Sequence, residues 1–398
     1  MRWMTRTWAV ALPFLTFGLS GCLSPVAMHD AVLAYDRTVT QVGTEQLLLN
    51  IARARYHRPI HFTTVSNVAA TFDFRVTAGV TPPQVGTNAH ALVPIFSGSV
   101  AENPTITIVP IEGEEFTKRI LTPLDEGKFH FLVRQGIDPS LLLRMMAREC
   151  RLTDGKQERV IANNPEKADE YQEFRRRTLH MMFLHQARNL YVEPMIFEES
   201  LEVPLESVQV LQALKEGYSL KVLDKTRSMV LTKTVIGRLV MTNYDPDTLT
   251  NEARRTLHLE ATKWPSSDLL VDIRPDHPGG DYPMHGTFRF RSFNSVLVFL
   301  AQGIGEQPEY DVNKDPRTGP VRFNPAKILA VFEGDTRPDD AAVAVEYEGR
   351  TFAIRGGSAE DPQAVRWNLD AFRVLYQLFQ MTVTDVSRAL APTISIAK

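Results

Sequence analysis

Val68-Ala-Ala-Thr-Phe-Asp-Phe-Arg-Val-Thr77 places an apolar residue at every second position. An alternation with a period of two is typical of a β-strand with one apolar face. Residues 81–90 then supply two prolines, a glycine and an asparagine, and residues 91–100 return to apolar and small side chains. We therefore expect a β-hairpin made of residues 68–77 and 91–100, with 104–109 as a further β-rich run.

Helical patterns flank this expected hairpin. Before it, Val32, Tyr35, Val39 and Val42 recur at the spacing of one helix face. Gly43 is expected to interrupt this pattern, and a second apolar stripe follows that Pro59 stops, namely Leu48, Ile51 and Ala52. After it, helix starts are marked by an aspartate that can act as the cap, followed by a proline that suits the first helical position. These pairs are Asp138-Pro139, Asp245-Pro246 and Asp361-Pro362.

The rest of the chain interleaves short helices with short strands. A pattern of strand, helix and two strands over residues 195–235 is partly repeated over 268–303, and Glu348-Gly349 predicts a hairpin turn. Residues 151–170 are polar and charged and suggest a surface insertion or a domain boundary. The helix that begins at Asp361 carries apolar residues on one face, namely Leu369, Phe372, Tyr376 and Phe379.

The first 21 residues have the pattern of an export signal. Arg2 and Arg6 give a positive start, residues 8–19 are largely apolar and uncharged, and small residues precede Cys22. The apolar stretch is shorter than the about 20 residues that a membrane-spanning helix needs. This pattern favours a signal that is removed after export.

Leu19-Ser-Gly-Cys22 resembles the lipobox of bacterial lipoproteins. The resemblance implies lipidation of the Cys22 thiol, cleavage before it, and a further acyl chain such as palmitate on the new amino terminus. Leu23 follows, whereas an aspartate there would imply retention in the inner membrane. We therefore expect a chain anchored in the outer membrane and facing the periplasm. The stretches 46–56 and 103–116 also resemble uncharacterised bacterial lipoproteins, and this second resemblance implies no activity.

Together these patterns indicate the α+β class: a mixed, multi-domain chain with small sheets and hairpins packed by helices, behind a lipid-anchored N-terminus. A length of 398 residues suggests more than one domain. The expected divisions are a signal peptide (1–21), a lipid anchor and N-terminal helical region (22–66), a β-hairpin segment with a helical subdomain (67–165), an α+β domain (166–310), and a C-terminal hairpin and helix (311–398).

Composition limits the partners and the chemistry. A formal net charge of −3 provides no strong attraction for nucleic acid, so we expect none as a partner. Once Cys22 is lipidated, Cys150 is the one remaining thiol and has no second cysteine with which to form a disulfide within the chain. We read Cys150 as a buried, inert residue. The run Arg175-Arg176-Arg177 is interpreted as a solvated face paired with nearby carboxylates.

No catalytic or cofactor motif is complete. The sequence has no phosphate-binding loop, no G-x-S-x-G elbow and no H-E-x-x-H pair, so no cofactor is expected. His180 and His185 lie about 140° apart around a helix and would not face one metal ion. The loop from 272 to 285 offers carboxylate and imidazole groups that suit zinc or acid–base work. Its weak candidates are Asp272, Asp276, His277 and His285.

Two classes of function remain open. The first is a structural, assembly or binding protein of the envelope, which associates with itself through residues 68–100 or with other envelope proteins. A membrane β-strand needs about 9–11 residues, and both expected strands have that length, so membrane insertion is the extreme case. The second class is a periplasmic metal-assisted hydrolase that uses the 272–285 loop. The absence of catalytic motifs favours the first.

Overall fold

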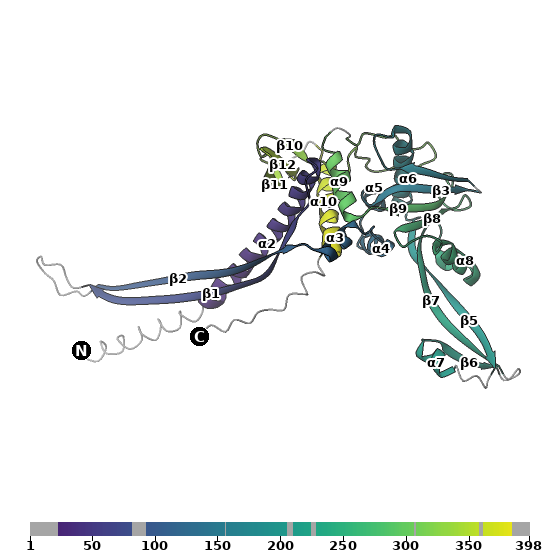
Figure 1. Cartoon of the computed structure of the whole chain (residues 1–398), viewed down its shortest axis with the longest axis horizontal. Coiled ribbons are helices and arrows are strands. Elements are labelled where there is room, and N and C mark those ends of the chain that lie inside the picture. Colours follow the sequence, from purple (N-terminus) through teal and green to yellow (C-terminus); the bar gives the residue numbers. More distant parts are fainter. Residues whose placement is uncertain are drawn as a thin grey trace, which may run out of the picture. The chain divides into compact units, whose positions relative to one another are not determined.

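The computed structural model describes residues 23–81, 93–155, 157–204, 210–223, 228–305, 308–357 and 361–383. These residues form nine α-helices, α2–α10, and three β-sheets, so the α+β class is confirmed (Figure 1). The chain divides into two units. Of the described residues, the first unit holds 23–46, 61–81 and 93–112, and the second holds 47–60 and those from 113 to 383. The predicted signal peptide and Cys22 lie outside the described residues.

The first unit contains most of helix α2 (Leu23–Arg55) and a two-stranded antiparallel ribbon made of β1 (Phe62–Thr81) and β2 (Val93–Ile111). Gln46 joins the helix to the base of the ribbon. Its side chain donates to Thr63 Oγ1 (2.6 Å) and accepts from the Thr63 amide (3.0 Å). These two hydrogen bonds fix the start of the ribbon against helix α2.

The predicted hairpin is present, but its register and length differ from the expectation. Val68 pairs with Ile106 and Thr77 with Ser97, and the strands are 20 and 19 residues long instead of ten each. The expected separate run at 104–109 is part of β2. The β-branched residues 105–109 continue the strand, and Pro104 is tolerated because β2 is an edge strand. One irregularity lies between Val65 and Asn67.

The second unit is built on a seven-stranded mixed sheet in the order β4-β3-β9-β8-β7-β5, with β6 also paired to β7. β7 and β8 run parallel, and the other neighbours are antiparallel. All six residues of β8 are buried. The strands are β3 (Ala147–Asp154), β4 (Gln157–Ala162), β5 (Tyr191–Pro204), β6 (Ser219–Leu223), β7 (Ser228–Thr242), β8 (Asp268–Ile273) and β9 (Met284–Phe290).

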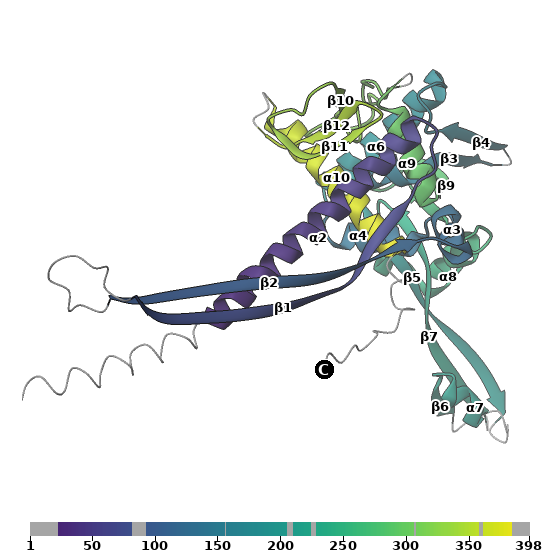
Figure 2. The same ribbon diagram turned by 60° about the vertical axis from the view of Figure 1, so that its left-hand side comes forward.

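The outer parts of β5 and β7 continue beyond the body of this sheet as a second hairpin. β6 and the short helix α7 (Val210–Lys215) lie at its far end (Figure 2). We call this hairpin with β6 and α7 the β5–β7 arm. The helices of the second unit are α3 (Glu114–Leu121), α4 (Glu126–Arg134), α5 (Pro139–Met146), α6 (Ala168–Gln186), α8 (Asn251–Ala261), α9 (Phe293–Gln302) and α10 (Pro362–Val383), with a 3₁₀ turn at Pro246–Thr248.

Capping by aspartate explains where several of these helices begin. The Asp138 side chain accepts from the Ser140 amide, and Asp361 accepts from the amides of Gln363 and Ala364. Both starts are confirmed. Asp245-Pro246 begins only the 3₁₀ turn, although its Asp245 side chain makes the same type of contact to the Asp247 amide.

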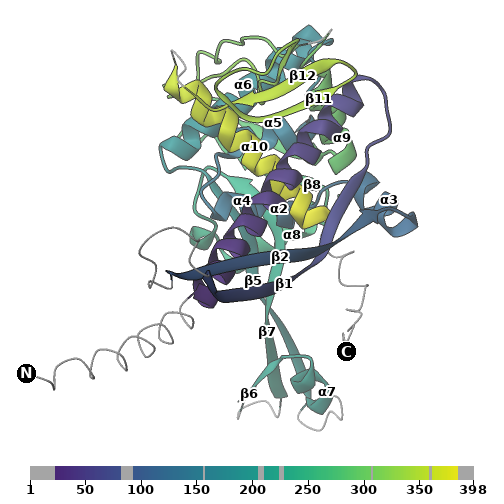
Figure 3. The same cartoon turned by 90° about the vertical axis from the view of Figure 1, so that its left-hand side faces the viewer.

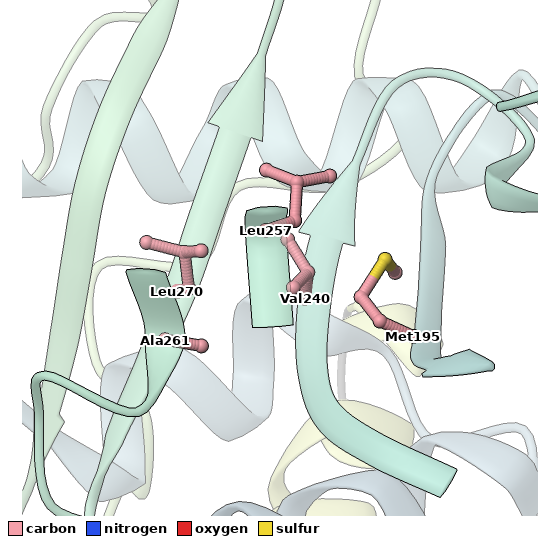
Figure 4. Close-up of a cluster of buried hydrophobic side chains, with 5 residues drawn as sticks. All are labelled: Met195, Val240, Leu257, Ala261 and Leu270. Atoms are coloured by element: carbon pink, nitrogen blue, oxygen red, sulfur yellow. The ribbon is translucent and has the colours of Figure 1, made fainter. Parts of the chain in front are cut away.

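One part of the core lies where α8 covers the sheet. Met195 on β5, Val240 on β7 and Leu270 on β8 pack against Leu257 and Ala261 of the helix, all at most 5% exposed (Figure 4). Each large side chain removed from water here contributes about 1.5–3 kcal/mol. This cluster packs α8 against β5 and β7, and it includes Leu270 of the neighbouring strand β8.

A small three-stranded sheet, β10-β12-β11, precedes the last helix. Its strands are β10 (Phe332–Gly334), β11 (Ala341–Tyr347) and β12 (Arg350–Arg355). The predicted turn is confirmed: Glu348 and Gly349 both have positive φ, 49° and 75°, as a tight hairpin turn requires. Helix α10 packs against β12 (Figure 3). Tyr56, just after α2, contacts the rings of Tyr347 and Phe352.

The apolar face predicted for α10 is partly confirmed. Phe372 and Phe379 are buried, at 6% and 7% exposed, whereas Leu369 is 37% exposed and lies outside the core. The buried face is centred on Ala371, Leu375 and Leu378. In the described part of the chain, no helix has the length and hydrophobicity needed to cross a membrane.

Candidate functional site

The β1–β2 ribbon is the first candidate. Among the described residues, each strand of the ribbon pairs with the other and with no third strand (Figures 1, 2 and 3). At about 3.3 Å per residue, β1 extends over roughly 66 Å. β1 contains no proline, so its row of donors is uninterrupted, whereas β2 contains Pro94, Pro104 and Pro110.

The register separates two faces of the ribbon. Residues that lie opposite each other in an antiparallel pair share a face, and so do alternate residues along one strand. The even face, as we call it, therefore contains these positions: 68, 70, 72, 74, 76, 78 and 80 of β1, with 94, 96, 98, 100, 102, 104 and 106 of β2. The odd face contains the residues between them. All even positions are apolar or glycine except Glu102, while the odd face is rich in Thr, Ser and Asn and includes Asp73 and Arg75.

The second candidate is the loop from 272 to 285, where the structure brings two of the four predicted residues together. Asp272 on β8 lies directly opposite His285 on β9 in the sheet register, and Asp272 Oδ1 is 3.1 Å from His285 Nδ1. The other ring nitrogen, Nε2, is 2.7 Å from Glu260 Oε1 on α8. The imidazole is therefore held between two carboxylates on opposite sides of the ring.

Asp272 has further partners. Tyr244 donates from its hydroxyl to Asp272 Oδ2 (2.5 Å), and Arg274 donates from Nε to the same oxygen (2.8 Å). Asn243 fixes the start of the loop, because its side chain donates to the carbonyl of Arg274 and accepts from the amide of the same residue. The Asp272 carboxylate is thus fully engaged within a rigid local network.

The electrostatics of this cluster favour a charged imidazole. The hydrogen bond that His285 donates to Asp272 is the largest cause of its raised pKa, about 9; Glu260 raises this pKa further, and burial opposes both. Burial raises the pKa of Asp272, but the hydrogen bonds from His285 and Tyr244 and the charge of Arg274 outweigh it, so that pKa is lowered. The raised pKa favours the imidazolium form of His285, whose two N–H groups point to the carboxylates of Asp272 and Glu260.

A cavity of about 490 Å³ opens beside the cluster. Asp272 and His285 line it together with the side chains of Arg159, Arg177 and Arg274. The lining holds more positive than negative charge, which disfavours a metal cation. Among the described residues, no group of three or more His, Cys, Asp or Glu side chains is arranged to hold a metal ion.

The other two predicted residues of the loop are not hydrogen-bond partners of Asp272 or His285 among the described residues. Asp276 is exposed, and the ring of His277 packs on Tyr244 with 4.9 Å between ring centroids. On α6, His180 is fully buried between Thr318 Oγ1 (3.1 Å) and the Gly279 carbonyl (2.8 Å), and burial lowers its pKa to about 4.

Cys150 is buried, as predicted, and burial raises the pKa of its thiol to about 12. A thiol with so high a pKa is unreactive at neutral pH.

A buried arginine network was not predicted from the sequence. The interpretation of residues 175–177 as a solvated face is wrong for Arg175 and Arg177, which are 0% and 8% exposed. Arg144 and Arg175 donate to backbone carbonyls of 325–326, and Arg144 also pairs with buried Glu309 at 3.0 Å. These contacts hold a long segment without helices or strands against α5 and α6. The only sequence signal was the position of the arginines on an otherwise apolar helix face.

No protein-family model, no curated protein and no solved structure matches this chain. Function must therefore be argued from the geometry above.

Proposed function

We propose that this chain is a lipid-anchored protein of the bacterial envelope with a structural or assembly role, and that it associates with copies of itself through the edges of the β1–β2 ribbon. The anchor is the lipid on Cys22, and the place is the periplasmic side of the outer membrane. The observation that carries the proposal is a ribbon of 20 and 19 residues whose outer edges pair with no other described strand.

Elementary energetics support a partner at these edges. A two-stranded hairpin by itself is marginally stable in water. A long edge presents a row of unpaired donors and acceptors that serves as a template for another strand. A membrane anchor would hold chains at one surface, so that further contacts become effectively intramolecular and weak edge pairing is strengthened.

The two edges are chemically different, which favours pairing of β1 of one copy with β2 of the next. β1 has no proline, so every residue of this strand has an amide N–H. The three prolines of β2 lack this donor but keep their carbonyl acceptors. A contact between unlike surfaces of identical chains generates rings or filaments and not simple dimers. We therefore propose assemblies of more than two copies.

Helix α2 in the same unit adds a second apolar surface. Val32, Val39 and Val42 belong to the predicted helical face, and they are 59%, 41% and 37% exposed. Neighbouring copies aligned by their ribbons would bring these helices close together. Burying each valine would then contribute to the same association.

The geometry gives less support to a metal-assisted hydrolase. Both ring nitrogens of His285 are engaged with carboxylates, its raised pKa keeps it protonated, and arginines line the adjacent cavity. A general base or a metal ligand needs a free nitrogen lone pair at the working pH. The cluster fits an ion-paired connection between α8, β8 and β9.

The oligomeric state of the full chain in mild detergent tests the proposal. Replacing residues 68–106 by a short Gly-Ser turn that joins Asn67 to Thr107 removes most of the ribbon and leaves the second unit intact. By light scattering, we expect the wild-type chain to form a discrete assembly and the shortened chain to be a monomer. The far-ultraviolet circular dichroism spectrum of the shortened chain should still show the helical signal of the wild type.

A matched control shortens the other hairpin of the chain. Replacing residues 201–231 of the β5–β7 arm by the same turn should leave the assembly unchanged. A wild-type chain that is monomeric at all concentrations, or a ribbon deletion that still assembles, would contradict the proposal.

A further inference from the structure

The cavity beside His285 lies at one end of the main sheet, where β3 and β8 end and β4 and β9 begin. Helix α6 contributes Arg177 to its wall. The volume of about 490 Å³ falls within the about 300–1,000 Å³ that is typical of small-molecule sites. Part of the wall is apolar, and its residues are Leu152, Ile273, Pro275, Pro283 and Met284. The cavity is therefore large enough for an organic molecule and offers it both charged and apolar contacts.

Two arginines of the wall are fixed by the same arrangement of neighbours. Arg177 donates from Nε (3.1 Å) and Nη2 (2.7 Å) to Glu173 Oε1, which also accepts from the Tyr282 hydroxyl (3.0 Å). The Arg177 guanidinium lies over the ring of Tyr282, with its Cζ 4.5 Å from the ring centroid. The side chain is 9% exposed. A guanidinium that is stacked on a ring and bonded along one edge is already ordered before a ligand binds.

Arg274 repeats this arrangement with other elements of the chain. Its Nε and Nη2 both lie 2.8 Å from Asp272 Oδ2, which also accepts from the Tyr244 hydroxyl. Its Cζ is 4.4 Å from the centroid of the Tyr244 ring. Each carboxylate oxygen thus holds the Nε and Nη2 edge of a guanidinium, and Nη1 is the remaining nitrogen. Among the described residues, Nη1 of Arg274 has no hydrogen-bond partner, and Nη1 of Arg177 has only a long contact to the Pro283 carbonyl (3.4 Å).

The positive charge of the wall exceeds the negative charge that contacts it. Arg159 on β4 is exposed and makes no hydrogen bond or ion pair with a described residue, although it lies close enough to Glu170 for an electrostatic interaction. With Arg177, Arg274 and the imidazolium of His285, it gives the wall four positive groups. Three carboxylates contact these groups, namely Asp272, Glu173 and Glu260. One positive charge is therefore left without a carboxylate in contact among the described residues.

We propose that this cavity binds a small organic molecule through an oxyanion, either a phosphate or a carboxylate group. The oxyanion accepts hydrogen bonds from Nη1 of Arg177 and Arg274 and from the exposed Arg159, and the organic part of the ligand packs against the apolar wall. Guanidinium groups match the oxygen spacing of both oxyanions and form charge-assisted hydrogen bonds with them. Because two of the three guanidinium groups are already ordered, binding costs little side-chain entropy. The site lies within the second unit and does not depend on the proposed self-association.

Isothermal titration calorimetry of the full chain in mild detergent tests this site with three probes of similar size: phenyl phosphate, benzoate and benzyl alcohol. The heat of adding each probe to detergent alone is subtracted. We expect at least one of the two anions to bind about tenfold more tightly than the neutral alcohol, because the hydrogen bonds to the guanidinium groups are charge-assisted. Added salt should weaken the binding of the anion. Tighter binding of phenyl phosphate identifies a phosphate ligand, and tighter binding of benzoate identifies a carboxylate.

Two substitutions locate the site. Arg159→Gln removes an exposed charge that makes no hydrogen bond or ion pair with a described residue, so the fold should be unaffected and the anion should bind several-fold more weakly. Arg274→Gln removes the Nη1 donor and should weaken binding about tenfold. Urea unfolding of this variant shows whether it folds, and Arg159→Gln alone decides if it does not. The matched control is Arg255→Gln on α8, where the side chain is 47% exposed and lies outside the cavity wall; it should bind the anion as the wild type does.

Three results would overturn the proposal. The first is that neither anion binds at millimolar concentrations, and the second is that benzyl alcohol binds as tightly as the anions. The third is anion binding that Arg159→Gln and a folded Arg274→Gln both leave unchanged, because the anion would then bind elsewhere. Light scattering of the same variants reports self-association separately and should give the wild-type assembly for each, so this proposal and the proposed function can fail independently.

Discussion

Removing the charge of Glu309 should destabilise the second unit far more than removing the charge of an exposed carboxylate. Glu309 is 8% exposed and accepts hydrogen bonds from Arg144 (3.0 Å), the Tyr171 hydroxyl (3.0 Å) and the Ile328 amide (2.7 Å). Glu309 contacts the buried Arg144 guanidinium directly and is linked to a second buried guanidinium, that of Arg175, through the Tyr171 hydroxyl.

The magnitude follows from the geometry. At 3.0 Å and an effective dielectric constant of about 20, the gross attraction between Arg144 and Glu309 is about 5 kcal/mol. The cost of desolvating both groups cancels much of this attraction in the native protein. When one partner is removed, however, the remaining buried charge has no compensation, and such changes cost about 3–5 kcal/mol. The pKa of Arg175 is lowered by burial, but only to about 10, so this group also stays charged at neutral pH.

The assay is urea unfolding of Glu309→Gln followed by tryptophan fluorescence. Trp367 is a local probe, because its indole donates to the Ile328 carbonyl (3.0 Å) and lies 5.8 Å from the Arg144 guanidinium. We expect a loss of about 3 kcal/mol with an unchanged slope.

The matched control is Asp335→Asn, whose side chain is 83% exposed and pairs with Arg350; it should cost less than about 1 kcal/mol. If Glu309→Gln costs no more than this control, the argument for an uncompensated buried charge is wrong.

Two further predictions concern the imidazolium cluster and the anchor. The pKa of His285 is raised above its ordinary value of about 6.5 to about 9, so its stabilisation is complete below pH 6.5 and is lost as the pH rises through 9. Because the His285 side chain is 38% exposed, we expect the free energy of unfolding, measured with urea, to fall by only about 1–2 kcal/mol over that pH range. The free energy of unfolding of His285→Gln should not change with pH over this range, and the same pH dependence in both proteins would refute the prediction. Cys22→Ser should abolish the lipid mass increment and release the chain from the outer-membrane fraction, and a variant that keeps both would show that the lipobox reading is wrong.

The sequence by itself determined features that depend on neighbours along the chain. The alternation from Val68 to Thr77 indicated a strand, because side chains of a strand point to opposite faces in turn. Asp138 and Asp361 indicated helix starts, because a cap bonds to amides only two or three residues away. Glu348-Gly349 indicated a hairpin turn for the same local reason.

Tertiary structure alone decided which distant groups meet. The loop suggested Asp272 and His285, but Glu260 joins them only because α8 packs on the sheet through a core that residue spacing does not reveal. Arg144 and Glu309 are 165 residues apart in the sequence. The residues that bury these two charges lie on other elements, so the sequence around each charge looks like that of an exposed residue. The register of the ribbon was likewise missed, since local alternation fixes the faces of a strand but not its length or its partner. Pairing between residues so far apart in the sequence depends on the packing of the whole chain, and the periodicity of the sequence does not predict it.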